Sequence, residues 1–301
     1  MKIESFAKIN LGIEVLGTRP DGYHEILTLF QSIDLADVLE ISDLPGGRIS
    51  LSGDDPEVPW DGTNLIHRAA SLLKEETGCP AGARISVAKN IPAGRGLGGG
   101  SSNAAAALIG LDRFWGLGLG REGLARLAGR LGADVPYFLE GGLCLGEGRG
   151  DRLTPLPDLP VHSVVLAFPP FAVATAGIYA AWRPSRASES SPAGAVEGLT
   201  SGAKPSKIMR FLENRDPGIL ENRLEETIFR FHPQLEEYKR FFRSRGAAAS
   251  LVSGTGSAVF GLFPEKAPAL DAQRLLRERV PAVLAVTLPS KEYARRLGAG
   301  V

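Results

Sequence analysis

The chain has 301 residues, 44% of them hydrophobic and 23% charged, which is ordinary for a globular protein that folds in water. Lys and Arg together number 34, as do Asp and Glu, so the chain lacks the basic excess that marks a nucleic-acid-binding surface. Two cysteines cannot form a disulfide framework, and four scattered histidines argue against a histidine-rich metal centre.

The first part of the chain is predicted to be rich in strands. Residues 2–17 alternate apolar and polar side chains over their first half, which predicts one or two strands, and Pro20-Asp21-Gly22 marks a turn after them. Segments 36–44 and 48–53 look like a second pair of strands. The opening sequence MKIESFAKINLG interleaves charged with apolar residues and offers no signal-peptide core, so we expect a cytoplasmic protein.

Helices and strands are predicted to alternate in the next segments. Residues 64–78 carry apolar side chains at helical spacing and end at a glycine, and residues 83–91 predict a strand. An alanine-rich helix is predicted over residues 103–115. Residues 121–146 predict a helix that ends at Gly132, then an aspartate-containing turn and a short apolar strand.

The composition of the sequence changes near residue 156, where three prolines within residues 155–160 indicate a linker. The length itself predicts about two domains, so we expect an α+β chain divided near this linker. The uncharged stretch 161–182 is interrupted by two prolines, which favours a strand, a break and a helix over a membrane span. The remaining elements are predicted as a strand at 162–168, a mobile loop at 183–206, helices near 219–231 and 234–245, a strand leading into 251–263, a helix near 266–279 and a strand at 282–288.

Residues 92–108, PAGRGLGGGSSNAAAAL, place five glycines within seven positions directly before the alanine-rich helix. Glycine costs backbone entropy, so the cluster needs a reason, and backbone N–H groups at a helix N-terminus are one way to bind a phosphate. Ser101 and Ser102 could cap the helix, and their hydroxyls could also face a phosphate or its Mg²⁺. Small alanines would let the helix pack close to a sheet. We therefore predict a triphosphate site.

Three other interpretations compete with a triphosphate site. Gly94, Gly96 and Gly99 match the dinucleotide-binding fingerprint, but the helix after them leads into another helix rather than the second parallel strand which that fold needs. A Walker A loop would end in Gly-Lys-Ser/Thr, and no lysine is present here. A flexible surface turn without a ligand explains neither the paired serines nor the alanines.

The glycine-rich segment 92–105 resembles the phosphate loop of the GHMP kinases, a family named for galactose, homoserine, mevalonate and phosphomevalonate. Segments 5–26 and 251–263 resemble the first and third motifs of that family. The resemblance implies a two-domain α+β fold, with an N-terminal ATP-binding domain at residues 1–157 and a smaller C-terminal α/β-sandwich domain at residues 158–301. It implies ATP and Mg²⁺ as well, and the expected ATP contacts are Pro92, Ala93, Gly94, Arg95, Gly96, Leu97, Gly98, Gly99, Gly100, Ser101 and Ser102.

One branch of the family is matched in more detail. AKINL followed by RPDGYHE, with LGADVPYFL, GEGRGDRL and NRLE, resembles the branch that acts on the small molecule 4-diphosphocytidyl-2-C-methyl-D-erythritol. This implies ATP-dependent phosphorylation of its 2-hydroxyl, a step of non-mevalonate isoprenoid synthesis, with no nucleic-acid or membrane partner. Two alternatives stay open: a GHMP kinase for another small alcohol, and a non-catalytic nucleotide-sensing or RNA-binding protein on the same fold.

The resemblance also implies a catalytic pair. Taken alone, Asp134 would be expected to cap a short helix at 136–139, and Lys8 to be a strand-edge charge or to extend toward water. By the resemblance, Asp134 is the base that takes the proton of the attacking hydroxyl. Lys8 would keep that carboxylate ionised and counter charge on the phosphoryl group. Asn10 lies two residues on, along the same strand face, and could bond the substrate.

A cytidine pocket is implied by four further residues. Tyr23 and His24 follow the Pro-Asp-Gly turn and would ordinarily be a half-buried tyrosine and a surface histidine. By the resemblance, Tyr23 stacks on the cytosine and His24 bonds its polar edge. Tyr179 would be the second aromatic wall, and Thr175 a nearby polar contact.

Several positions depart from the family pattern or have more than one interpretation. Arg95 puts a cation into the phosphate loop, where it would meet an ATP phosphate or point to solvent. Ala174 and Arg223 stand where serine and aspartate are frequent. Gly254 and Gly256 would approach the substrate diphosphate, support the phosphate loop or simply form a structural turn.

Overall fold

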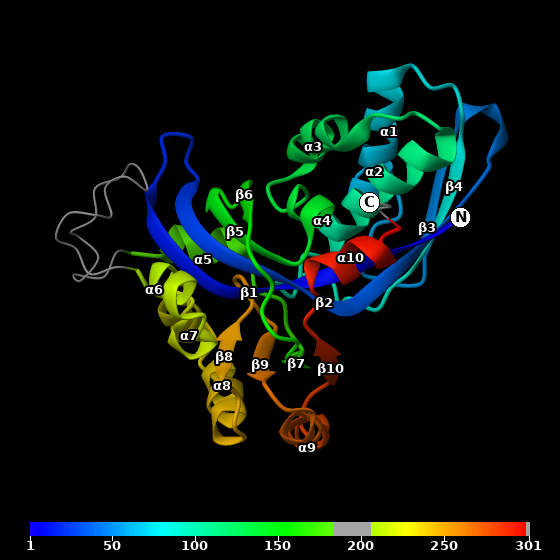
Figure 1. The fold of residues 1–301 in the computed structure, drawn as a ribbon. Coiled ribbons are helices and arrows are strands. Elements are labelled where there is room, and N and C mark those ends of the chain that lie inside the picture. Colours follow the sequence, from blue (N-terminus) through cyan, green and yellow to red (C-terminus); the bar gives the residue numbers. More distant parts are fainter. Residues whose placement is uncertain (184–205, 299–301) are drawn as a thin grey trace.

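The structure is a computed structural model that describes residues 1–183 and 206–298, and this part of the chain forms two sheets with helices packed on them (Figure 1). The loop predicted at 183–206 lies outside the described residues apart from its two ends. The strands are β1 (Lys2–Thr18), β2 (His24–Ser42), β3 (Ile49–Gly53), β4 (Ala83–Ala88), β5 (Leu143–Gly148), β6 (Arg152–Pro155), β7 (Ser163–Ala167), β8 (Ala249–Val252), β9 (Val259–Phe263) and β10 (Ala282–Val286). The α-helices are α1 (Leu65–Thr77), α2 (Gly99–Trp115), α3 (Gly120–Leu131), α4 (Tyr137–Glu140), α5 (Thr175–Ala181), α6 (Lys207–Asn214), α7 (Glu225–Phe231), α8 (Gln234–Ser244), α9 (Lys266–Arg277) and α10 (Ser290–Arg296).

The six-stranded sheet is built on one long hairpin. β1 and β2 pair antiparallel over nearly their whole length, and β2 also pairs with β4 and β5. The strand order is β3-β4-β2-β5-β6, with β1 on β2. The two segments predicted as a second strand pair do not pair with each other. β3 runs parallel to β4 instead, because β1 and β4 already occupy the edges of that part of β2.

The four-stranded sheet has the order β10-β7-β9-β8 and is antiparallel throughout. Alternate residues of β9, one of its two central strands, face opposite sides. Phe260 and Leu262 pack with Ile9 and Leu11 of β1, whereas Phe263 packs with Phe242 of α8. The long hairpin therefore covers one face of this sheet, and α8 and α9 pack on the other. None of the described helices is long and apolar enough to cross a membrane.

The alanine-rich helix α2 lies in the core of the N-terminal half, packed on β1 and β2 and against α1. Its alanines at 104–107 are buried, and a Cβ at Gly110 would lie 2.7 Å from the Cδ1 atom of Ile41. The predicted close packing of the helix on the sheet is confirmed. The helix begins at Gly99 rather than at Asn103, so the two serines predicted to cap it lie inside its first turn.

The chain returns to the N-terminal half at its end, which the sequence did not indicate. Tyr293 of α10 is buried beside Phe6, with ring centroids 5.3 Å apart, and its hydroxyl donates to the carbonyl oxygen of Phe138 at 2.7 Å. Leu297 belongs to the same hydrophobic cluster. The division into domains at residues 157 and 158 stays a prediction.

A buried carboxylate fixes the segment that enters the glycine-rich loop. Asp37 of β2 is fully buried and accepts hydrogen bonds from the backbone N–H groups of Asn90 at 2.7 Å and Ile91 at 2.8 Å. It also accepts from the amide of Asn103 at 2.9 Å and pairs with the ammonium group of Lys89. The exit of β4 and the start of α2 are thereby tied to β2.

Replacing Asp37 by Ala should therefore lower the free energy of unfolding by about 3 to 5 kcal/mol, because a buried ammonium and two backbone donors lose their acceptor. Urea unfolding would measure the loss. Asp43→Ala, at an exposed position just beyond β2, is the control and should change stability by less than about 0.5 kcal/mol. Equal losses in the two variants would contradict the role given to Asp37.

Candidate active site

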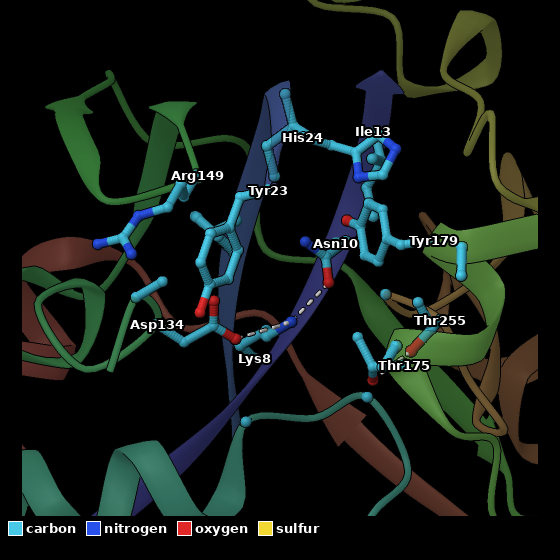
Figure 2. Close-up of a pocket in the computed structure, with 18 of the residues that line it drawn as sticks. Lys8, Asn10, Ile13, Tyr23, His24, Asp134, Arg149, Thr175, Tyr179 and Thr255 are labelled. Atoms are coloured by element: carbon cyan, nitrogen blue, oxygen red, sulfur yellow. Dashed lines mark hydrogen bonds and ion pairs between the residues drawn. The ribbon is translucent and has the colours of Figure 1, made fainter. Parts of the chain in front are cut away.

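A cavity of about 610 Å³ opens between the glycine-rich loop, β1 and the segment around α5 (Figure 2). Residues from distant parts of the chain meet in it. The predicted site residues that line it are Lys8, Asn10, Tyr23, His24, Gly96, Gly98, Asp134, Thr175 and Tyr179.

Lys8 and Asp134 meet at this cavity. The Nζ atom of Lys8 lies 3.7 Å from Oδ2 of Asp134 and donates a hydrogen bond to Oδ1 of Asn10 at 2.6 Å. It also lies 5.3 Å from the centroid of the Phe30 ring. The Lys8 side chain is only 5% exposed, whereas that of Asp134 is 37% exposed. The expectation that Lys8 extends toward water is therefore wrong.

Burial controls the protonation of this lysine. Loss of hydration lowers the pKa of Lys8 below its usual value, and the nearby carboxylate of Asp134 opposes that effect. The ammonium is thus held by its partners against the cost of burial.

Asn10 has both ends of its amide engaged. Its oxygen accepts from Lys8, and its Nδ2 atom donates to the hydroxyl of Thr28 at 2.9 Å. That hydroxyl donates in turn to the carbonyl oxygen of Gly12 at 2.9 Å. In this arrangement Asn10 orients Lys8.

Asp134 lies in the short turn between α3 and α4. The backbone N–H of Val135 donates to the carbonyl oxygen of Gly132 at 3.2 Å, which closes the turn. The N-cap of α4 is Pro136, without a side-chain hydrogen bond, so Asp134 does not cap that helix. Its carboxylate is left to face the cavity (Figure 2).

The glycines of the glycine-rich loop differ in what the surrounding protein requires of them. Gly94, Gly96 and Gly98 have positive φ angles, and a Cβ at Gly96 would lie 2.0 Å from the carbonyl oxygen of Ser253. At these positions the absence of a Cβ lets the loop pack against its neighbours. At Gly100 no atom of the other described residues, its own helix backbone and chain neighbours aside, lies within 4 Å of the place of a Cβ, so packing among them does not require a glycine there.

The first turn of α2 leaves its backbone donors available. Its N-cap is Gly98, which has no side chain to accept from them. Ser102 is buried and its hydroxyl accepts from Ser5 at 2.7 Å, so it faces the protein interior. Ser101 is only partly buried. Of the two serines, Ser101 is therefore the better placed for a ligand.

The glycine-rich loop is tied to β1 and to the turn between β8 and β9. The N–H of Lys8 donates to the carbonyl oxygen of Leu97 at 3.0 Å. The hydroxyl of Ser253 donates to the carbonyl oxygen of Gly96 at 2.9 Å and accepts from the N–H of Asn10 at 3.3 Å. The turn therefore supports the loop, one of the interpretations left open for its glycines.

Arg95 serves as a structural tie in the same region. Its guanidinium donates to the carbonyl oxygen of Pro169 at 2.9 Å and to the hydroxyl of Ser257 at 2.9 Å, and it also bonds the carbonyl oxygen of Phe171. These acceptors hold the Nη1 atom and turn the side chain away from solvent, whereas contact of Arg95 with an ATP phosphate stays a prediction.

Aromatic side chains line another part of the cavity. The rings of His24 and Tyr179 have centroids 5.1 Å apart, and the ring of Trp182 is nearly perpendicular to that of His24, with centroids 5.7 Å apart. Burial lowers the pKa of His24, which favours its neutral imidazole, and burial raises the pKa of Tyr179 to about 12. Tyr23 is 58% exposed. The structure thus brings the three predicted aromatic residues to one cavity.

Thr175 and two residues without a predicted role also line the cavity. The hydroxyl of Thr175 bonds that of Thr255 at 2.8 Å, which joins the start of α5 to the turn between β8 and β9. Arg149, within the GEGRGDRL segment, lies over the ring of Tyr23. That segment stood out in the sequence, but no local pattern indicated which side chain it would contact.

Comparison with known protein families matches both halves of the chain. The family model described as "GHMP kinases N terminal domain" matches residues 64–142, and the one described as "GHMP kinases C terminal" matches residues 198–282. A protein of Acaryochloris marina named 4-diphosphocytidyl-2-C-methyl-D-erythritol kinase is 42% identical over 270 residues, which cover 87% of each chain. A protein of the same name from Geobacillus kaustophilus is 38% identical and covers 98% of this chain and 99% of its own.

Solved structures show the same likeness. A crystal structure of 4-(cytidine 5'-diphospho)-2C-methyl-D-erythritol kinase superposes with a TM-score of 0.78 at 37% identity, covering 95% of this chain and 99% of its own. Homoserine kinase from Cytophaga hutchinsonii superposes with a TM-score of 0.71 at 19% identity over 97% and 96% of the two chains. At that lower identity the likeness concerns the fold alone.

Proposed function

The chain belongs to the 4-diphosphocytidyl-2-C-methyl-D-erythritol kinases of the GHMP family, and we propose that it transfers the γ-phosphoryl group of ATP to the 2-hydroxyl of that substrate in the cytoplasm. This is a step in non-mevalonate isoprenoid precursor synthesis. The observation that carries the proposal is the Lys8–Asp134 pair, which lies at one cavity with an aromatic cluster and with the glycine-rich loop.

The glycine-rich loop and α2 fit a triphosphate. The first turn of α2 offers backbone N–H groups that no capping side chain uses, and the dipole of a 17-residue helix adds positive potential there. The space beside Gly100 is open. We assign ATP binding to the backbone of residues 92–102. The Arg95 side chain supports the loop through its hydrogen bonds to Pro169 and Ser257.

Mg²⁺ fits the same end of α2. The hydroxyl of Ser101 is the protein oxygen we assign to it, because the hydroxyl of Ser102 is already bonded to Ser5. Bound there with the nucleotide phosphates, the ion would neutralise their charge.

Asp134 and Lys8 are assigned the transfer of the proton and the balance of charge in this reaction. Asp134 accepts the proton that the 2-hydroxyl loses as its oxygen bonds the γ-phosphorus and the bond to ADP breaks. The ammonium of Lys8 attracts the carboxylate of Asp134 and balances charge on the transferring group. Asn10 holds Lys8 by its amide oxygen, so we propose an orienting role for Asn10 in addition to contact with the substrate.

The aromatic part of the cavity fits a cytosine ring. Tyr23 and Tyr179 supply faces for stacking, and the neutral imidazole of His24 can both donate and accept a hydrogen bond at the polar edge of the base. Thr175 is the nearby polar contact. Mevalonate and homoserine carry no base that could stack, so these residues distinguish the proposed substrate from other small alcohols.

We expect ADP release from Mg²⁺-ATP with 4-diphosphocytidyl-2-C-methyl-D-erythritol and none with mevalonate, homoserine or galactose. Asp134→Asn should lower kcat by about a hundredfold to ten-thousandfold, because it removes the base while keeping the shape of the side chain. A coupled ADP assay measures both. Turnover of another alcohol would disprove the cytidine pocket, and a fully active Asp134→Asn variant would disprove the assignment of the base.

The pH dependence of kcat/KM should show the loss of the Lys8 proton. Since the pKa of Lys8 is lowered by burial and the protonated form is the active one, activity should fall on the alkaline side at a pH below the usual pKa of lysine, 10.5. Asn10→Ala removes an acceptor that favours the charged amine, so it should move this alkaline limb to lower pH. Asn214→Ala, at the exposed end of α6, is the control and should leave the limb in place. An unshifted limb in Asn10→Ala would contradict the orienting role.

Two glycines of the loop should respond in opposite ways to alanine. Gly100→Ala should keep its stability, since the new methyl meets no neighbouring side chain or loop of the described residues, but raise KM for ATP by about tenfold or more by displacing the phosphates. Gly96→Ala should lose more than about 2 kcal/mol of stability, because its φ is positive and the methyl would clash with Ser253. Thermal unfolding and ATP titration of the rate would separate the two effects. Unchanged KM in Gly100→Ala would place the phosphates elsewhere.

A further inference from the structure

Arg149 lies at the cavity but has no part in the function proposed above. It belongs to the turn between β5 and β6, and its guanidinium carbon lies 5.1 Å from the centroid of the Tyr23 ring. We propose that Arg149 is a positioning residue that holds Tyr23 as a preformed wall for the base of the substrate. The inference rests on the proposed function, since it assumes that a base stacks on Tyr23.

Tyr23 needs such a support because its ring is mostly in solvent. Its backbone is well held: its N–H donates to Oδ1 of Asp21 at 3.1 Å, and its carbonyl oxygen accepts from the N–H of Arg19 at 2.7 Å. These bonds fix the main chain of the turn and leave the side-chain torsions free. If the ring must be immobilised when the ligand binds, the lost side-chain entropy weakens binding. A ring that is already held in place avoids this cost.

Arg149 is itself rigid enough to give that support. A single carboxylate oxygen, Oδ2 of Asp151, accepts from its Nε at 3.1 Å and from its Nη2 at 2.8 Å, and these two bonds restrain the guanidinium. Oδ1 of the same carboxylate accepts from the backbone N–H of Arg149 at 3.2 Å. Asp151 further raises the pKa of Arg149, so the charge that attracts the ring is permanent.

The arrangement leaves one face of the ring for a ligand. In the view of Figure 2, the Tyr23 ring lies between Arg149 and the side of the cavity that holds Asn10 and Tyr179. The guanidinium lies over one face of the ring, which leaves the opposite face for a base. Arg149 therefore acts on the base through Tyr23.

A double-mutant cycle tests this. Binding of cytidine and of CDP would be measured by calorimetry for the wild type, Arg149→Ala, Tyr23→Ala and the double variant. We expect Arg149→Ala to weaken both probes by the same factor, about two- to fivefold, and to have no further effect once Tyr23 is absent. With the full substrate, the loss should fall on KM rather than kcat.

Two further variants sharpen the result. Asp151→Asn keeps the charge of Arg149 but weakens the hydrogen bonds that hold its guanidinium. It should therefore weaken cytidine binding, as Arg149→Ala does. Arg152→Ala removes the same charge from a mostly exposed side chain that pairs with Glu25, and it should leave cytidine binding unchanged.

Each contrary outcome is distinct. If Arg149→Ala weakens CDP but not cytidine, and does so equally without Tyr23, Arg149 contacts the diphosphate and the inference is overturned. Unchanged binding of both probes also overturns it while leaving the cytidine pocket intact. A wild-type protein that binds neither probe overturns the proposed cytidine pocket, and this inference with it.

Discussion

The burial of one ammonium group is the constraint around which the site is arranged. Removing a lysine charge from water costs several kcal/mol unless charge and hydrogen bonds replace the lost hydration. Lys8 finds these replacements in the carboxylate of Asp134, the amide oxygen of Asn10 and the face of Phe30. They come from the α3–α4 turn and from both strands of the long hairpin. The buried charge that the proposed transfer of a phosphoryl group requires is therefore maintained because these partners meet in the folded chain.

The second constraint is the fixed distance between the parts that would hold the two substrates. The hydroxyl of Ser253 bonds both Gly96 in the glycine-rich loop and Asn10 on β1, and the backbone of Lys8 bonds that of Leu97. Strand, loop and turn are thus joined by direct hydrogen bonds. A site that works mainly by positioning depends on such rigidity, since small displacements of reacting groups cost large factors in rate.

Local patterns in the sequence identified most of the elements but not all their contacts. The glycine and alanine composition of residues 92–108 was sufficient to predict a loop followed by a closely packed helix, because it reflects backbone freedom and side-chain size. The same segment did not reveal which serine faces inward. That depended on Ser5 of β1, whose hydroxyl takes Ser102 as a partner. Likewise, Arg95 found its acceptors near residues 169–171, far along the chain.

By itself, the sequence determined the α+β class, the position of the glycine-rich loop and the likeness to a kinase family, because periodicity, glycine clusters and motifs are local properties. Tertiary structure alone decided that Lys8 is buried and that Arg149 covers Tyr23. It also decided that α10 closes the N-terminal core through Tyr293. These contacts join residues more than a hundred positions apart. Their geometry follows from how the sheets and helices pack, which no local spacing in the chain encodes.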